Sequence, residues 1–366
     1  MYIKSIHFEN YRNLKNAVFI PYNGINVICG DNAQGKTNLI ECIWLLTGGR
    51  SFRGSKDSEL IAFDSQSANI KAEFYAGGRD QTIEISIRGN HRTAVLNDVP
   101  KNYMSQIIGV FCAVIFSPHH LTLIKNGPEE RRNFIDGALC QIKPSYAARL
   151  TKYRRVLNER NALLKDIPRH RELEDTLDIW DEKLAYEGAL IARERISYTA
   201  QLSQSAIPYY QGISGGKEQL SLAYRSGCDA DFSMSPEEIK QHLLQKLRER
   251  HNDDIDCGYT VSGVHRDDLT VKINERDAKS FGSQGQQRSA VLALKLAEAA
   301  VLGQAKDETP VILLDDVLSE LDASRQEYLL QKLPSRQVFI TCCESSVNAE
   351  NMIYLKKGKI LPSKES

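Results

Sequence analysis

The feature that most constrains the fold of this chain is a short loop, Gly30-Asp31-Asn32-Ala33-Gln34-Gly35-Lys36-Thr37. It follows an apolar run at 24–29, which predicts a buried strand, and it precedes a helix-like run at 38–46. This pattern is typical of a phosphate-binding loop, whose backbone N–H groups turn toward phosphate oxygens. Lys36 would add positive charge at the terminal phosphates of ATP, and Thr37 would offer its hydroxyl to Mg²⁺. We therefore expect an α/β nucleotide-binding fold, with an ordinary strand-to-helix turn as the weaker alternative.

A pair of aspartates late in the chain predicts the metal side of the same site. The apolar run 311–314 indicates a buried strand, and Asp315 and Asp316 follow it directly. Ligands of α/β folds bind at the carboxyl ends of such strands. Asp315 would hold Mg²⁺ through water, and Asp316 would orient and deprotonate the water that attacks ATP. The alternative is an edge strand capped by solvated aspartates.

A third motif begins at Ser283, just before a helix expected at 286–302. Ser283 and the amides that follow would form a helix N-terminus able to receive an anion, although a plain N-cap fits the same residues. The motif lies roughly 30 residues before the aspartates. In this position it resembles the signature motif of ABC-type ATPases, and 319–322, which ends at Asp322, resembles their D-loop. The resemblance implies that Ser283, Gly285 and Gln286 complete the nucleotide site of a second copy.

The order of strand and helix patterns predicts one α/β domain interrupted by a helical lobe. Period-2 alternation predicts strands at 2–8, 69–75, 81–87 and 92–96. Helical periodicity runs from Pro128 to about Leu247, with a break at Ile167-Pro168 that predicts an antiparallel hairpin. Strand character returns at 259–273, 310–314, 337–341 and 352–355. We divide the chain into an N-terminal part of an ATPase head at 1–125, a helical lobe at 126–254 and a C-terminal part of the head at 255–366.

This layout resembles the heads of SMC and Rad50 proteins, because roughly 250 residues separate Gly30 from Ser283. Transporter motor subunits place these motifs much closer together, and SMC and Rad50 proteins carry far longer coiled coils. The chain is similar instead to the RecF family, the version with a short hairpin. The segments that carry this resemblance are 8–13, 51–53, 116–118, 127–136 and 263–269.

The resemblance implies an ABC-type (Rad50-like) P-loop ATPase head with an inserted helical lobe. It also implies slow Mg-dependent ATP hydrolysis and an ATP-dependent homodimer that binds DNA at single-strand/double-strand junctions. Such a protein helps to load recombinase at gaps, supports replication restart and SOS induction, and has RecR as a partner. Arg12 and Asn13 match family residues near the nucleotide, with strand-end solvation as the alternative. His265 and Arg266 also match, although a core histidine and a surface arginine are nearly as plausible.

Two departures from the superfamily pattern concern hydrolysis. Most members have glutamate after the metal-binding aspartate, whereas this chain has the shorter Asp316. The usual switch histidine is replaced near Thr341, and no glutamine of the Q-loop type follows 114–116. Both departures are compatible with a slow switch.

A basic segment at 143–171 is the candidate DNA surface, and Lys152, Arg154 and Arg155 are its candidate phosphate contacts. The whole chain has 47 basic and 47 acidic residues, so any such surface must be local. The segment carries nine basic and two acidic residues, but 172–187 carries seven acidic ones. DNA binding and mutual neutralisation of two helices are therefore weighed evenly. We expect backbone-directed, sequence-independent binding with steep salt dependence.

Other features limit where the protein works and what else it could be. The eight cysteines form no C-x-x-C pair, which disfavours zinc and fits a reducing cytosol. The sequence contains neither a signal-like N-terminus nor a stretch of about 18 apolar residues, so we expect a cytoplasmic protein without a membrane partner. The alternatives are a P-loop small-molecule kinase with the helical lobe as its lid, and a transporter motor subunit.

Overall fold

The computed structural model describes residues 1–333, 336–342 and 351–361 and contains two compact units. The first unit comprises Met1–Thr122, Tyr209–Lys217 and the chain from Arg288 onward. The second comprises Leu123–Pro208 and Glu218–Gln287, so that 255–287 belongs to it. The helices α4 (Leu177–Ser214) and α8 (Gln284–Lys306) contribute residues to both units. The division by function at 126 and 255 stays a prediction.

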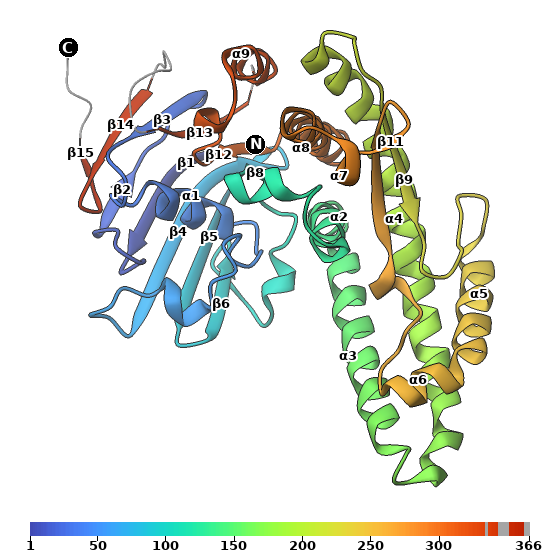
Figure 1. The fold of residues 1–366 in the computed structure, drawn as a ribbon. Coiled ribbons are helices and arrows are strands. Elements are labelled where there is room, and N and C mark those ends of the chain that lie inside the picture. The colour runs from blue at the N-terminus through green and yellow to red at the C-terminus, as the bar shows by residue number, and fades with distance from the viewer. Residues whose placement is uncertain (334–335, 343–350, 362–366) are drawn as a thin grey trace. The chain divides into compact units, whose positions relative to one another are not determined.

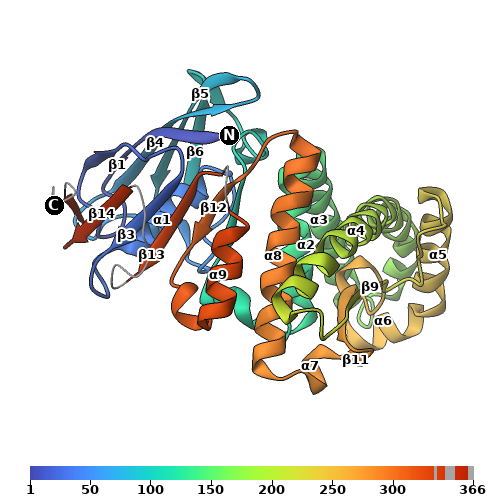
Figure 2. The ribbon, with the colours of Figure 1, turned by 90° about the horizontal axis from the view of Figure 1, so that it is seen from above.

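A mostly parallel sheet of the first unit carries the phosphate-binding loop. Its strand order is β15-β14-β3-β13-β12-β8, and only β15 runs antiparallel to its neighbour. The bounds are β3 Ile25–Cys29, β8 Ala113–Phe116, β12 Val311–Leu314, β13 Val338–Cys342, β14 Asn351–Lys356 and β15 Lys359–Leu361. Every residue of β8 and β12 is buried, as their continuous apolar sequences predicted. Because β3, β13 and β12 are parallel neighbours, their carboxyl ends lie at one edge of the sheet (Figure 2).

An antiparallel sheet forms the other layer of the first unit, with strand order β2-β1-β4-β5-β6-β7. The bounds are β1 Tyr2–Glu9, β2 Ala17–Phe19, β4 Ser67–Ala76, β5 Arg79–Arg88, β6 His91–Leu96 and β7 Val99–Lys101. The strands predicted from period-2 alternation are confirmed. Gly77 and Gly78 both adopt positive φ angles, 62° and 74°, in the tight turn between β4 and β5.

The helix α1 (Lys36–Leu45) joins the two sheets of this unit through one apolar core. Its residues Leu39, Ile40 and Ile43 are fully buried. They belong to the same cluster as Ile28 of β3 and Ile70 of β4. Since α1 begins at Lys36, this packing fixes the start of the helix at the phosphate-binding loop. A further helix of this unit, α9, spans Ala323–Gln331.

The second unit is built on the predicted antiparallel helical hairpin (Figure 1). Its helices α2 and α3 span Pro128–Ile142 and Pro144–Asp166, and the hairpin returns through α4. Three ion pairs connect α3 and the residue before it to α4, namely Lys143–Glu194, Lys152–Glu187 and Arg160–Asp181. The residue numbers increase on the α3 side while they decrease on the α4 side, so the two helices run antiparallel. No helix of the described residues is long and apolar enough to cross a membrane.

A small antiparallel sheet, β11-β10-β9, completes the second unit with α5, α6 and α7. The bounds are β9 Leu220–Arg225, β10 Asp268–Ile273, β11 Arg276–Asp277, α5 Pro236–Glu249, α6 His251–Cys257 and α7 Ala278–Phe281. The prediction of helical structure from Pro128 to about Leu247 was wrong after α4, because Gly215-Gly216 follow that helix and the strand β9 comes next. The strand predicted over 259–273 begins only at Asp268.

Candidate nucleotide-binding site

The loop Gly30–Thr37 turns sharply between β3 and α1. Gly35 has a φ of 109°, and a Cβ atom there would lie 2.8 Å from Asn13 Oδ1, so both conformation and space require glycine. Ala33 adopts the left-handed region as well, with a φ of 63°. The ammonium of Lys36 donates to the carbonyl oxygens of Gly30 at 2.6 Å and Asp31 at 3.1 Å. Lys36 is therefore folded back over the loop that it belongs to.

The two predicted metal ligands are in direct contact. Asp315 follows β12, and its Oδ1 accepts a hydrogen bond from Thr37 Oγ1 at 3.0 Å. Burial raises the pKa of Asp315 to about 6, although the hydrogen bond from Thr37 opposes this shift. A carboxylate and a hydroxyl are thus brought together at the start of α1, and both present the oxygen atoms that Mg²⁺ prefers.

Thr341 of β13 links the two aspartates. Its hydroxyl accepts from the backbone N–H of Asp316 at 2.8 Å, and it lies 3.1 Å from Asp315 Oδ1 and 3.4 Å from Asp316 Oδ1. Thr341 is buried, whereas Asp316 is partly exposed and has a φ of 51°. Thr341 is therefore in contact with both the predicted metal ligand Asp315 and the predicted catalytic Asp316.

A cavity of about 910 Å³ adjoins the loop, and its lining residues all belong to the first unit. Residues predicted from the sequence line it, namely Arg12, Asn13, Asn32, Ala33, Gly35, Lys36, Thr37 and Asp316. Residues to which sequence reasoning gave no role line it too, and these include Lys15, Asn16, Asn38, Arg53, Glu59 and 61–65. The cavity is therefore much larger than the contacts of a phosphate chain alone require.

Arg12 and Asn13 have different surroundings within this cavity. The Arg12 guanidinium donates to both carboxylate oxygens of Glu41, at 2.6 Å and 3.1 Å. Glu41 is fully buried in α1 and also accepts from Tyr11 and Ser51. Arg12 thus fixes α1, whereas Asn13 donates to the Ala33 carbonyl of the loop at 3.4 Å.

Arg53 is one of the charged residues of the cavity to which no sequence motif points. Its guanidinium donates to Asn38 Oδ1 at 3.0 Å, and its positive charge acts to lower the pKa of Asp315. In the sequence, Arg53 stands out only as part of the family-like segment 51–53. No local pattern reveals its role, because only the folded chain returns 51–65 to the loop.

The signature-like motif belongs to the second unit, at the start of α8. Ser283 Oγ accepts from the Gln286 N–H at 3.2 Å, and Gln286 Oε1 accepts from the Ser283 N–H at 2.8 Å. This reciprocal pair is a capping box. Gln286 Nε2 also donates to Glu218 at 2.7 Å, while Ser283 itself is exposed. The motif is therefore a well-ordered helix N-terminus with an exposed serine.

The D-loop-like segment is tied both to the aspartates and to α8. Ser319 Oγ donates to the Asp316 carbonyl at 2.8 Å. Arg288 of α8 forms an ion pair with Glu320 at 2.8 Å. Asp322 caps α9 by accepting from the Arg325 N–H at 3.0 Å, and these hydrogen bonds lower its pKa. The carboxylate of Asp322 is thus engaged within its own chain.

His265 and Arg266 lie in the second unit, in a different unit from the cavity. His265 Nδ1 lies 2.9 Å from the Tyr153 hydroxyl and its Nε2 lies 3.0 Å from the Thr260 carbonyl. Burial lowers the pKa of His265 to about 4, so the ring is neutral near pH 7. Arg266 is exposed, and its guanidinium lies 5.4 Å from the ring centroid of Tyr259.

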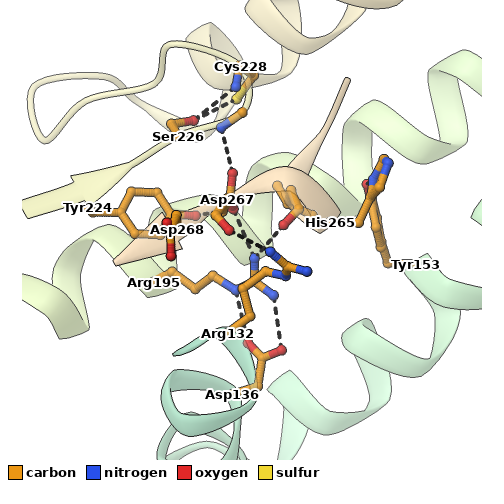
Figure 3. Close-up of polar contacts among 12 residues, drawn as sticks. Arg132, Asp136, Tyr153, Arg195, Tyr224, Ser226, Cys228, His265, Asp267 and Asp268 are labelled. Atoms are coloured by element: carbon orange, nitrogen blue, oxygen red, sulfur yellow. Dashed lines mark hydrogen bonds and ion pairs between the residues drawn. The ribbon is translucent and has the colours of Figure 1, made fainter. Parts of the chain in front are cut away.

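A buried ion-pair network next to His265 connects two of the family-like segments, 127–136 and 263–269 (Figure 3). Arg195 donates to Asp136 at 2.9 Å and to Asp267 at 2.9 Å. The Tyr224 hydroxyl also donates to Asp267, and Arg131 forms two hydrogen bonds with Asp268. The segments 127–136 and 263–269 are therefore held together by charge-assisted hydrogen bonds.

Some residues of the candidate DNA surface are already engaged in ion pairs within the chain, whereas others are exposed. Lys152 forms an ion pair with the buried carboxylate of Glu187, which Arg149 also approaches at 3.7 Å. Arg160 is buried between Asp181 and Asp254. Arg154 and Arg155 are exposed. Neutralisation by α4 and α6 therefore applies to Arg149, Lys152 and Arg160, and leaves two exposed neighbouring arginines on α3.

The sequence is similar to known proteins along nearly its full length. The family described as RecF/RecN/SMC N terminal domain matches residues 2–358. The DNA replication and repair protein RecF of Ruminiclostridium cellulolyticum is 42% identical over 344 residues, covering 93% of this chain and 92% of that protein. The chain belongs to the RecF family. RecF of Agathobacter rectalis is 38% identical and covers 98% of this chain and 99% of that protein.

Solved structures show the same fold. A structure of the recombination mediator protein RecF with ATPrS in the RecFOR pathway has a TM-score of 0.93 and 37% identity, covering 98% of this chain and 97% of that one. A structure of RecF with ATP has a TM-score of 0.91 at the same identity. The Smc head domain from Pyrococcus furiosus, at 16% identity and a TM-score of 0.55, shows the shared fold alone. The predicted ABC-type, Rad50-like head with an inserted helical lobe is confirmed.

Proposed function

We propose that this chain is an ATP-dependent DNA-binding protein of recombinational gap repair and replication restart. The observation that carries the proposal is the contact between Thr37 and Asp315 beside the phosphate-binding loop. It supports a nucleotide–metal site, and the full-length similarity to proteins named RecF supports the biological role. The same similarity disfavours the kinase and transporter alternatives.

ATP would bind with its phosphates on the loop Gly30–Thr37. Lys36 would exchange the carbonyls of Gly30 and Asp31 for phosphate oxygens, because an ammonium forms stronger hydrogen bonds with charged acceptors. Thr37 and Asp315 have the oxygen atoms to hold Mg²⁺, with water completing the shell. Mg²⁺ would neutralise charge on the β and γ phosphates.

Hydrolysis would rest on Asp316, which lines the cavity beside Lys36. Asp316 would accept a proton from the attacking water. Its side chain is one methylene shorter than glutamate, and its backbone is held in the left-handed region with its N–H bonded to Thr341. A short, restrained base supports a slow ATPase that acts as a switch.

The second half of each nucleotide site would come from another copy of the chain. Ser283 is exposed at the N-terminus of α8, where the positive end of the helix dipole favours an anion. Ser283, Gly285 and Gln286 would therefore contact ATP bound by the partner copy. ATP would then drive head-to-head dimerisation, and hydrolysis would release it.

The decisive experiment is the molar mass in solution with ADP and with ATP plus Mg²⁺. We expect doubling with ATP alone, and we expect Ser283→Arg to bind ATP yet stay monomeric. Ser280→Arg is the matched control, because Ser280 is also exposed and lies three residues earlier. Dimers of Ser283→Arg with ATP would refute the shared site, and a monomeric wild type would refute the switch.

DNA binding would use the exposed face of the helical hairpin, including Arg154 and Arg155, at single-strand/double-strand junctions. Lys152 would contribute less, because it is already paired with Glu187. RecR would be a further partner and recombinase loading the outcome. Binding to a gapped duplex should weaken steeply with salt and show no sequence preference. Binding that does not change with salt would argue against phosphate contacts.

A further inference from the structure

Phe63 combines two properties that a phenylalanine rarely shows together. Its relative exposure is 107%, the highest of the large hydrophobic residues in the described part of the chain. It also lines the cavity that adjoins the phosphate-binding loop. A fully solvated aromatic ring at a cavity forgoes the large favourable burial of its surface. A ligand that covers the ring would recover this burial.

The backbone that carries Phe63 is fixed at both sides. The Ala62 N–H donates to the Asn10 carbonyl at 2.8 Å, and the Arg12 N–H donates to the Leu60 carbonyl at 2.8 Å. A turn hydrogen bond from the Ser65 N–H to the Ala62 carbonyl, at 3.0 Å, closes the segment after Phe63. The ring is therefore held at the cavity by an ordered turn that is joined to the strand end at 10–12.

The position of the phosphate-binding loop determines which group of a bound nucleotide reaches the part of the cavity at Phe63. Phosphates held by Lys36 and Thr37 occupy their part of the cavity. The ribose and base of the nucleotide must take the remaining volume, whose lining includes Lys15, Asn16 and 61–65. We propose that Phe63 is the platform on which the base of the bound nucleotide stacks. This inference rests on the proposed nucleotide site and deepens it.

The chemistry of stacking makes specific demands that Phe63 meets. A base needs a flat, apolar and accessible ring face, and a phenyl ring supplies this without a competing hydrogen bond. Stacking contributes to affinity for the base but not to affinity for the phosphates. Phe63 should therefore distinguish a nucleotide from a bare polyphosphate.

The test compares ADP with pyrophosphate, because ADP has the base and pyrophosphate only the phosphates. Calorimetry with Mg²⁺ would measure both dissociation constants for the wild type, Phe63→Ala and Phe63→Trp. Tyr103→Ala is the matched control, since Tyr103 is 71% exposed in the same unit but does not line the cavity. ADP is chosen because it should not drive dimerisation.

We expect Phe63→Ala to raise the dissociation constant for ADP by about tenfold and to leave that for pyrophosphate within about twofold. Phe63→Trp and Tyr103→Ala should bind ADP like the wild type. Unchanged ADP binding by Phe63→Ala would overturn the inference, and so would an equal loss for both ligands. A variant that binds ADP normally but no longer dimerises with ATP would place Phe63 at the interface between copies instead. A wild type that binds neither ligand would overturn the nucleotide site itself.

Discussion

The buried imidazole of His265 should make the second unit sensitive to mild acid. Its Nε2 faces the Thr260 carbonyl, which can only accept, so the neutral ring carries its proton on Nε2 and accepts from Tyr153 at Nδ1. Burial lowers its pKa from 6.5 to about 4, and the charges of Arg266, Arg132 and Arg160 add to this shift. Protonation is therefore disfavoured in the folded state.

The sign and size of the effect follow from linkage. The unfolded chain takes up a proton at His265 as the pH falls through 6.5, whereas the folded unit does so only near pH 4. This contribution to stability is complete above about pH 7 and is lost as the pH falls from 6.5 toward 4. At pH 5 the loss amounts to about 2 kcal/mol, because the two pKa values differ by about 2.5.

Urea unfolding at pH 7.5 and pH 5 would measure this loss. The chain has two tryptophans, and in a Trp44→Phe background the fluorescence of Trp180 reports on the second unit. His265→Gln in that background keeps a donor for Thr260 and an acceptor for Tyr153 but does not titrate. Between pH 7.5 and pH 5, the free energy of unfolding of the variant should fall by about 2 kcal/mol less than that of its parent. An equal loss in both proteins would refute the buried, neutral histidine.

Three further predictions concern the other parts of the chain. Asp316→Asn should lower phosphate release by about 10²–10⁴-fold and keep the ATP-dependent doubling of mass, whereas an unchanged rate would remove Asp316 as the base. Arg195→Met would leave its two buried aspartate partners without the positive charge of Arg195, and should destabilise the second unit by about 3–5 kcal/mol in urea unfolding; wild-type stability would contradict this. Arg154→Glu with Arg155→Glu should weaken binding to gapped DNA and make the logarithmic salt slope shallower by about two, and an unaltered slope would exclude these arginines from the DNA contacts.

The sequence predicted the parts of the site that depend on local patterns. The loop at Gly30–Thr37 and the aspartates after 311–314 each need one buried strand and a few polar residues directly after it. The strand β12 is a continuous apolar run and β3 is apolar except for Asn26, so their burial and their ends could be read from the sequence. Their adjacency at one sheet edge followed from the rule that α/β ligands bind there.

The rest of the cavity depends on contacts between distant segments. Arg53 and Phe63 reach it because 51–65 returns to the loop, and Arg12 is directed by the buried carboxylate of Glu41. In β9, Ser221 and Ala223 separate the apolar positions, and the strand is stabilised by β10, which lies more than 40 residues later. Periodicity within a short window cannot detect such partners.

Four of the five family-like segments fall into two groups, and the second group gives the signature motif a rigid base. Segments 8–13 and 51–53 contribute to the nucleotide cavity, whereas 127–136 and 263–269 build the ion-pair network of the second unit. Asp267 and Asp268 lie at the start of β10, and the chain continues from there through β11 and α7 to Ser283. We propose that Ser283 contacts ATP on another copy, and such a contact gains from a fixed starting point, since positional freedom at Ser283 would have to be lost on dimerisation. Charged groups buried at the start of this path, each satisfied by several partners, resist rearrangement more than an apolar contact of similar size would.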